Sequence, residues 1–452
     1  MQFWKWLYPG LGVKRWLLVI FGGVLLMSAG LAWVVNVELL AAIERETRHW
    51  LGLLLSWLPE EVAPAAGAVT GALGLALVVL GLRGMVYAVV SAAAPHRLEN
   101  LAEVVYNAHH LRRGPKVVAI GGGTGLSTML RGLKQWTSNI TAIVTVADDG
   151  GSSGRLREEL GVLPPGDIRN TLVALADTEA LMEQLFQYRF PSGNGLKGHS
   201  FGNLFIAAMT DITGDFEQAV RESSKVLAVR GRVLPSTLDS VVLRAEYEDG
   251  GTAVGESQIP QPGRRIRRVY LEPADARPLD DALRALREAD VIVLGPGSLY
   301  TSVLPNLLVP GLADAIRESQ ALRIYVCNVM TQPGETDGYR ASDHLRALFD
   351  HVGPGIVDYA LLHRGRVHPA LEEKYRRTGQ VLVIPDVKNV RALGVVPVTR
   401  FLVSQTELVR HDSALLARAI EELWQTHRAR RGRGRSPLLE WLFPAAPRRA
   451  GW

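Results

Sequence analysis

The stretch Lys116–Asp177, KVVAIGGGTGLSTMLRGLKQWTSNITAIVTVADDGGSSGRLREELGVLPPGDIRNTLVALAD, decides the fold. It opens with an apolar run, Val117–Ile120, which predicts a buried strand, and a glycine-rich turn then leads into a helix expected over Leu126–Lys134. Such a turn leaves backbone N–H groups free at the positive end of the helix dipole, where a phosphate can approach the main chain. The residues of this turn that we expect to bind a ligand are Gly122, Gly123, Thr124 and Gly125.

The next strand, expected over Ile140–Val146, ends at two carboxylates and a second glycine turn. Open α/β sheets bind ligands at the carboxyl ends of their strands, so this turn joins the same candidate site. Asp148 and Asp149 suit a ribose hydroxyl or a Mg²⁺ ion, with Asp148 as the candidate metal ligand. An Asp-Gly turn without any ligand is the alternative. The other candidate ligand-binding residues in this stretch are Ser152, Asp167 and Asn170.

The first glycine turn does not match a dinucleotide-binding fingerprint. In a G-x-G-x-x-G run that starts at Gly121, the third glycine would stand where the chain has Leu126. The sequence also lacks a Walker lysine, a G-x-S-x-G elbow and a His/Cys cluster with metal-ligand spacing. These patterns favour a phosphate cradle over dinucleotide binding, and none of them indicates hydrolysis.

Two later segments carry small and polar residues that could reach the same ligand. The segment GLKGHSFGN supplies His199 and Asn203, although a lone histidine is more often structural. The loop GPGSLYTS supplies Gly297 and Ser298, and it follows the apolar run Val291–Leu294. This second loop repeats the arrangement at Val117–Gly125, in which an apolar strand leads into a polar, glycine-bearing loop.

The composition bounds the class of protein. At 452 residues the chain exceeds one average domain and can bury a large core. Its formal net charge of +5 comes largely from arginines near apolar segments and in the tail, so we interpret it as a membrane-surface signal and expect no nucleic-acid binding. The single cysteine, Cys327, excludes an internal disulfide and fits a reducing compartment.

Two long apolar stretches predict an N-terminal transmembrane hairpin over 1–94, with spans at about 16–35 and 65–82. Small residues in the second stretch would let the two helices pack closely. A buried soluble helix pair or, for the first stretch, a signal peptide is the alternative. Basic residues flank the pair and acidic residues lie between the spans, which places both termini in the cytoplasm. We therefore expect a multi-pass protein of the cell membrane whose main domain is cytoplasmic.

Beyond the hairpin we expect a juxtamembrane linker at 95–115, a globular domain at 116–425 and a basic amphipathic tail at 426–452. Strand and helix patterns alternate in the globular domain, which predicts an α/β fold with a mostly parallel sheet and helices on both faces. Between Val229 and Pro278 the pattern changes to alternating apolar and charged residues, which predicts a small antiparallel insertion. The tail suits either an anionic membrane surface or a solvated, disordered segment.

Six motifs, in this order, resemble the gluconeogenesis-factor (YvcK-type) branch of the CofD-like proteins: GGGTGLS, TVADDGGSSGRLR, LPPGDIRN, GLKGHSFGNL, GPGSLYTSVLPNLLV and MTQPGETDGY. The resemblance covers roughly 116–423. It implies a Rossmann-like fold related to 2-phospho-L-lactate transferase and binding of UDP-sugars, chiefly UDP-N-acetylglucosamine. Two family contacts with the UDP-sugar, a tyrosine and an arginine, fall on Tyr375 and Arg410. The membrane hairpin and the basic tail are additions seen in some relatives.

The resemblance also implies a role that links carbon metabolism to peptidoglycan precursor supply and cell shape, with no assigned catalytic residue and no required cofactor. We expect a regulator at the inner face of the membrane that forms a homo-oligomer and contacts a wall-precursor enzyme. The competing hypothesis is a Mg²⁺-dependent, CofD-like transferase that moves a phosphate-bearing group from a nucleotide diphosphate donor, because binding a pyrophosphate and cleaving it use the same loops. An NAD-dependent oxidoreductase ranks last, because the fingerprint is imperfect.

Overall fold

The computed structural model describes residues 13–35, 63–93, 111–177, 180–261, 263–404 and 410–432. The chain divides into two compact units, Met1–Asn107 and Ala108–Trp452, and each is described by itself. Residues 95–110 of the predicted linker and 433–452 of the predicted tail lie outside the described residues. The domain boundaries expected from the sequence therefore stay predictions.

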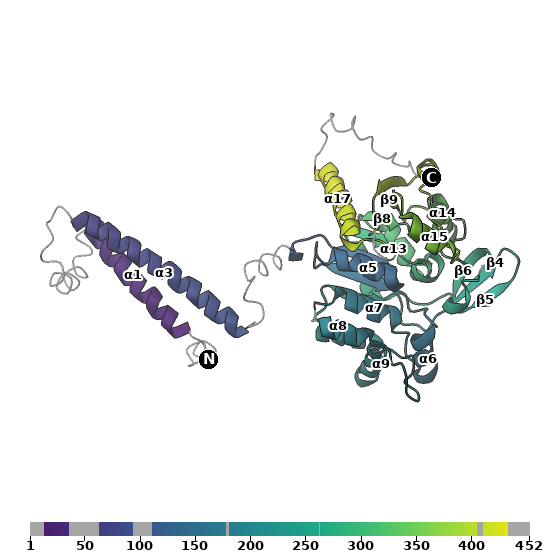
Figure 1. The fold of residues 1–452 in the computed structure, drawn as a ribbon, viewed down its shortest axis with the longest axis horizontal. Helices are drawn as coiled ribbons and strands as arrows, with labels where there is room; N and C mark the ends of the chain where they lie inside the picture. The colour runs from purple at the N-terminus through teal and green to yellow at the C-terminus, as the bar shows by residue number, and fades with distance from the viewer. Residues whose placement is uncertain are drawn as a thin grey trace. The chain divides into compact units, whose positions relative to one another are not determined.

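The first unit contains two antiparallel helices, α1 (Val13–Val35) and α3 (Ala63–Ala93), which lie side by side (Figure 1). Glycines line their contact. A Cβ atom added at Gly30 would lie 2.4 Å from the backbone nitrogen of Gly71, and one added at Gly74 would lie 2.5 Å from that of Met27. The two backbones therefore approach each other as closely as small residues allow, which is the packing expected of helices inside a lipid bilayer.

Among the described residues, one continuous helix, Ala65–Ala88, is long and apolar enough to cross a membrane. The apolar segment Arg15–Leu31 of α1 falls short of that length. The prediction of two spans is therefore supported for the second span alone. The acidic loop expected between them lies almost wholly outside the described residues.

The second unit is organised around a seven-stranded sheet in the order β10-β9-β8-β7-β1-β2-β3. Every pair of neighbours in it is parallel, which confirms the predicted fold class. The inner strand β1 is buried along its whole length, because helices cover both faces of the sheet. The strands are β1 (Val117–Gly121), β2 (Ile140–Val144), β3 (Arg232–Pro235), β7 (Val291–Leu294), β8 (Leu322–Val326), β9 (Tyr359–His363) and β10 (Val396–Arg400).

The chain leaves β1 towards β2 and leaves β7 towards β8, in opposite directions across the sheet. Right-handed crossovers then put the helices that follow these two strands on opposite faces. The helices are α5 (Gly123–Leu133), α6 (Gly151–Leu160), α7 (Gly166–Leu175), α8 (Ala180–Gln187), α9 (Phe201–Thr213), α10 (Phe216–Val226), α11 (Asp280–Glu288), α12 (Leu304–Leu307), α13 (Leu312–Glu318), α14 (Ala341–Val352), α15 (Pro369–Arg376), α16 (Val387–Ala392) and α17 (Ser413–Gly432). The crevice between β1 and β7 is the topological switch point of the sheet.

The predicted antiparallel insertion is confirmed. It is a three-stranded sheet of β4 (Val242–Tyr247), β5 (Thr252–Val254) and β6 (Ile266–Glu272), which projects from one side of the second unit (Figure 1). Every second residue of β4 is buried, as the alternating sequence pattern predicts. We call this sheet and its turns the arm.

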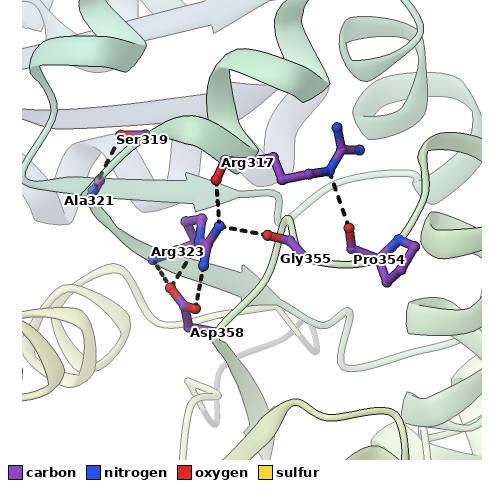
Figure 2. A network of polar contacts seen from close by, with 7 residues as sticks. All are labelled: Arg317, Ser319, Ala321, Arg323, Pro354, Gly355 and Asp358. Carbon is purple, nitrogen blue, oxygen red and sulfur yellow. Dashed lines mark hydrogen bonds and ion pairs between the residues drawn. The ribbon is translucent and has the colours of Figure 1, made fainter. Parts of the chain in front are cut away.

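An arginine network ties the amino ends of β8 and β9 together, at the edge opposite the switch-point loops (Figure 2). The Arg323 guanidinium donates to both carboxylate oxygens of Asp358, at 3.0 Å from Nε and 2.7 Å from Nη2. Its Nη1 donates to the carbonyl oxygens of Gly355, at 2.6 Å, and Arg317, at 3.1 Å. This two-point arrangement suits a planar guanidinium and fixes two strands whose other ends lead to the candidate site.

Candidate functional site

Two glycine turns meet at the switch point. The first opens α5 after β1, and the second, Gly295–Ser302, follows β7. A Cβ atom added at Gly125 would lie 2.6 Å from the carbonyl oxygen of Pro296, so the turns pack backbone against backbone. Asn328 fixes the second turn, because its Nδ2 donates to the Gly297 carbonyl at 2.8 Å while its Oδ1 accepts from the Gly297 N–H at 3.3 Å.

A cavity of about 210 Å³ lies over these two turns, and we call it the switch-point cavity. It brings together the predicted residues of both glycine turns and Arg410, which stands far along the chain. Its lining is Gly122, Gly123, Thr124, Gly125, Thr128, Pro296, Gly297, Ser298, Ser302, Asn328, Val329, Met330, Gln332, Gln380, Arg410 and His411. The start of α5 therefore lines the same space as Arg410. Helix N-terminal N–H groups together with a guanidinium are suitable chemistry for a phosphate or diphosphate.

Asp167 lies directly behind the first glycine turn. A Cβ atom added at Gly122 would stand 2.3 Å from Asp167 Oδ2, and the Gly123 N–H donates to the carboxylate. Burial, followed by the neighbouring charge of Asp148, raises the pKa of Asp167 to about 7. Asp148 Oδ1 in turn accepts a hydrogen bond from the Gly150 N–H at 2.9 Å, so one oxygen of this carboxylate stabilises the predicted Asp-Gly turn.

Asp149 is turned towards the arm. Its Oδ1 accepts a hydrogen bond from the Ser257 N–H at 2.8 Å, which anchors the 3-10 turn Glu256–Gln258. Asp149, which the sequence predicts to contact the ligand, therefore also has a structural role, because it holds the arm against this loop. The same turn brings Glu256 towards the sheet, where burial, followed by the charge of Asp148, raises its pKa to about 8. The sequence did not indicate Glu256, because this residue stands far along the chain from Asp148 and Asp149 and approaches them only in the folded structure.

Ser152, His199 and Asn203 form a buried network away from the lining of the switch-point cavity. Ser152 Oγ lies 3.0 Å from His199 Nδ1 and accepts from Asn203 Nδ2 at 3.1 Å. Burial lowers the pKa of His199, and the charge of Arg155 lowers it further. Asn170 accepts a hydrogen bond from the guanidinium of Arg169 at 2.8 Å. The structure thus groups these predicted residues with one another and gives each of them a protein partner.

Tyr375 does not line the switch-point cavity. It lies in α15 and packs against a small apolar cluster that includes Val329 and Met330, whose own side chains are part of the cavity wall. The residue that reaches the cavity from this part of the chain is Gln380, just after the helix. Of the expected tyrosine–arginine pair, Arg410 lines the cavity and Tyr375 does not.

Several lining residues were missed by sequence reasoning. Asn328 and Gln332 stand in or beside a loop that the motif analysis identified, but their amide groups carry no spacing signal. His411 directly follows Arg410, and this position next to a predicted ligand contact is the sequence signal that could have indicated it as a lining residue. Glu335 lies behind the second turn, where its carboxylate accepts from the Tyr300 N–H at 3.3 Å and burial raises its pKa to about 7.

Within the described residues, no three His, Cys, Asp or Glu side chains gather as a metal site. A metal ion near Asp148 would therefore complete its coordination with phosphate oxygens and water. Mg²⁺ usually binds in this way, so the residues present fit that ion when it accompanies a diphosphate.

Comparison with known proteins gives consistent results. A family model described as "2-phospho-L-lactate transferase CofD" matches residues 117–403. A protein named "Gluconeogenesis factor" from Halalkalibacterium halodurans is 57% identical over 307 residues, covering 68% of this chain and 95% of that protein. The protein of the same name from Bacillus subtilis is 52% identical over 310 residues, covering 68% and 98%. A relative from Nostoc sp., whose name also describes a gluconeogenesis factor, is 51% identical over 423 residues, covering 93% and 92%.

Solved structures agree with these sequence matches. A crystal structure of a "upf0052 family" protein from Bacillus halodurans is 55% identical and has a TM-score of 0.66. It covers 68% of this chain and 99% of its own length. That protein therefore corresponds to the second unit alone, whereas the match to the Nostoc protein extends into the first unit.

Proposed function

This chain belongs to the CofD family, in its gluconeogenesis-factor branch, and we propose that it is a UDP-sugar-binding regulator held at the inner face of the cell membrane. Its ligand would be UDP-N-acetylglucosamine or a related UDP-sugar. Ligand occupancy would change its contacts with a wall-precursor enzyme, and so connect carbon metabolism with cell-wall synthesis and cell shape. No catalytic residue is assigned in this proposal.

The observation that carries the proposal is the switch-point cavity. The start of α5 and Arg410 both line it, and the glycines of the two turns place few side chains on its floor. At about 210 Å³ the cavity is smaller than the about 300–1,000 Å³ typical of sites that enclose a whole drug-sized ligand. It would therefore hold the diphosphate and an adjoining part of the ligand, while the rest extends over the rim.

The family model's own name supports one alternative, a transferase that cleaves a nucleotide diphosphate. Asp148 lies near enough to Asp167 beside the first glycine turn for its charge to raise the pKa of Asp167, and Asp148 is the carboxylate that would hold a Mg²⁺ ion. Bound there, Mg²⁺ would neutralise diphosphate charge. For a regulator, the same residues would hold the diphosphate with its cation without carrying out a reaction.

Membrane attachment is the second part of the proposal. The apolar helix Ala65–Ala88 and its glycine-packed partner α1 support a tether at the N-terminus. A second crossing by α1 would return the chain to its starting side and keep both termini in the cytoplasm. The cytoplasmic unit would then act next to membrane-bound steps of wall synthesis.

The test uses full-length protein in detergent micelles. Calorimetry should show binding of UDP-N-acetylglucosamine and weaker or no binding of GDP and NAD. Incubation with UDP-N-acetylglucosamine, Mg²⁺ and cell extract should then release no UDP or UMP beyond the extract alone. Enzyme-dependent release that disappears in Asp148→Asn would overturn the regulator and establish a transferase.

A further inference from the structure

His411 occupies a distinct place in the wall of the switch-point cavity. It follows Arg410 and is held by the backbone, because it forms an antiparallel bridge with Val403 and because the next N–H, that of Asp412, donates to Leu402 O at 2.8 Å. The ring therefore has a fixed position at the end of the cavity that Arg410 lines.

The two ring nitrogens of His411 have different environments. The imidazole donates a hydrogen bond to the backbone carbonyl of Cys327, at the end of β8. Nε2 is buried and has no hydrogen-bond partner. The proton engaged with Cys327 is therefore on Nδ1, and a neutral ring keeps a lone pair on Nε2.

The ring stays neutral at physiological pH. Burial, followed by the charge of the neighbouring His363, lowers the pKa of His411 to about 4. A buried acceptor without a partner costs free energy, so Nε2 is satisfied best when a ligand supplies a donor. This neutral acceptor differs in chemistry from the other polar groups of the lining, because the N–H groups at the start of α5 and the Arg410 guanidinium suit an anion.

We infer that His411 Nε2 accepts a hydrogen bond from an N–H or O–H group of the bound ligand, and so selects the uncharged part of the nucleotide-sugar. The inference rests on the proposed function and makes it more specific. A UDP-sugar offers two such donors, the imide N–H of uracil and the sugar hydroxyls. Cytosine presents a ring nitrogen acceptor in place of the imide N–H, so a base-reading His411 would favour uridine over cytidine diphosphate.

The test compares His411→Asn with His363→Asn in full-length protein in detergent micelles. An asparagine amide can replace Nδ1–H as the donor to Cys327, but it does not reach the position of Nε2. His363 is a matched control, because its Nε2 is also buried without a partner but it does not line the cavity. Calorimetry gives the dissociation constants of UDP, CDP and UDP-N-acetylglucosamine, and thermal melting reports on folding.

Two results would support the inference. If His411 contacts the base, His411→Asn weakens UDP about three- to tenfold and leaves CDP nearly unchanged, as expected for one neutral hydrogen bond. If it contacts the sugar, the same loss appears for UDP-N-acetylglucosamine and is absent for UDP and CDP. His363→Asn should change none of these ratios.

Two other results would overturn it. Unchanged binding of all three ligands, or an equal loss for all three together with a lowered melting temperature, would make His411 a structural residue. Should wild-type protein bind no uridine ligand at all, the proposed function itself fails, and with it the ligand that His411 is inferred to read.

Discussion

At the scale of single residues, the two glycines at the start of α5 have different reasons to be glycine. Gly123 has a φ of +64°, and a Cβ added there would have Ser302 Oγ, at 3.7 Å, as its nearest neighbour, within the cavity lining. Gly125 faces the backbone of the second turn, 2.6 Å from Pro296 O. One glycine leaves room for the ligand, and the other allows the floor of the cavity to close.

These roles predict different phenotypes. Gly123→Ala should weaken diphosphate binding at least tenfold and cost about 1 kcal/mol of stability, because a side chain at positive φ is strained and the methyl group enters the cavity. Gly125→Ala should instead lower the free energy of unfolding by about 1–3 kcal/mol through overpacking. Calorimetry and urea unfolding measure the two effects. Unchanged binding in Gly123→Ala would show that the first turn is only structural.

Single substitutions also distinguish the contribution of Arg410 to ligand binding from that of Tyr375. Arg410→Ala should weaken UDP and UDP-N-acetylglucosamine alike by on the order of 1.5–3 kcal/mol, because a charge-assisted contact is lost. Tyr375→Ala should cost less affinity, because Tyr375 packs against the apolar cluster that contains Val329 and Met330 and does not line the cavity. Titration calorimetry of both variants checks the order. A larger loss for Tyr375→Ala would mean that the aromatic ring moves onto the base when ligand binds.

Asp167 makes stability depend on pH. Its pKa is raised from an ordinary value of 3.8 to about 7, so the folded state holds the proton more tightly than the unfolded chain does. The free energy of unfolding should therefore fall as pH rises from about 4 through about 7. Asp167→Asn should lose less stability between about pH 5 and about pH 8 than wild type does, as measured by calorimetric melting at both pH values.

The control for this prediction is Asp249, whose pKa is lowered to about 2, chiefly by its hydrogen bond with Arg264. Its contribution is present above the unfolded pKa and is lost only as pH falls towards 2, so Asp249→Asn should leave the pH 5 to 8 slope unchanged. Equal slopes for wild type and Asp167→Asn would contradict the assignment.

At the scale of elements, the start of α17 packs closely against α5. A Cβ added at Gly132 would lie 1.9 Å from the Ser413 carbonyl oxygen, at the first residue of α17. Gly132→Ala should therefore displace the start of α17, cost about 1–3 kcal/mol of stability and weaken ligand binding, although Gly132 does not line the cavity. A displacement of α17 would reach the cavity along the chain, because Arg410 and His411 lie just before the first residue of this helix.

The matched control lies one residue earlier on the same helix. Arg131 forms an exposed ion pair with Glu183, and Arg131→Ala should cost less than about 1 kcal/mol and leave binding unchanged. Urea unfolding and calorimetry measure both variants. If Gly132→Ala were as mild as Arg131→Ala, the two helices would not be coupled as described.

The sequence predicted elements better than it predicted contacts between them. Val117–Ile120 and Val291–Leu294 are continuous apolar runs, and each forms a buried parallel strand as expected. The glycine turns after them were also located correctly, because turn chemistry is local. The roles of Asp149 and Tyr375 follow instead from which distant segment packs on each of them, and no spacing pattern records that information.

At the scale of the whole molecule, the tether predicts a topology that labelling can measure. The native Cys327 is buried, so single cysteines introduced elsewhere can be labelled on intact cells with little background. A cysteine within 36–62 should react with an impermeant maleimide, and one within 433–452 should react only after the membrane is opened. Labelling of the C-terminal position alone would contradict a hairpin with both ends inside.

The order of strands also has a consequence for synthesis. Val117 of β1 pairs with Ile140 on one side and with Val291 on the other, so one edge of β1 stays without its partner long after the first edge is paired. At about 5–20 residues per second, the ribosome leaves that apolar edge open for on the order of ten seconds or more. Unpaired strand edges promote misassembly, so we expect newly made chains to be most prone to aggregation during this interval. The ligand-binding state is completed later still, when the segment with Arg410 emerges.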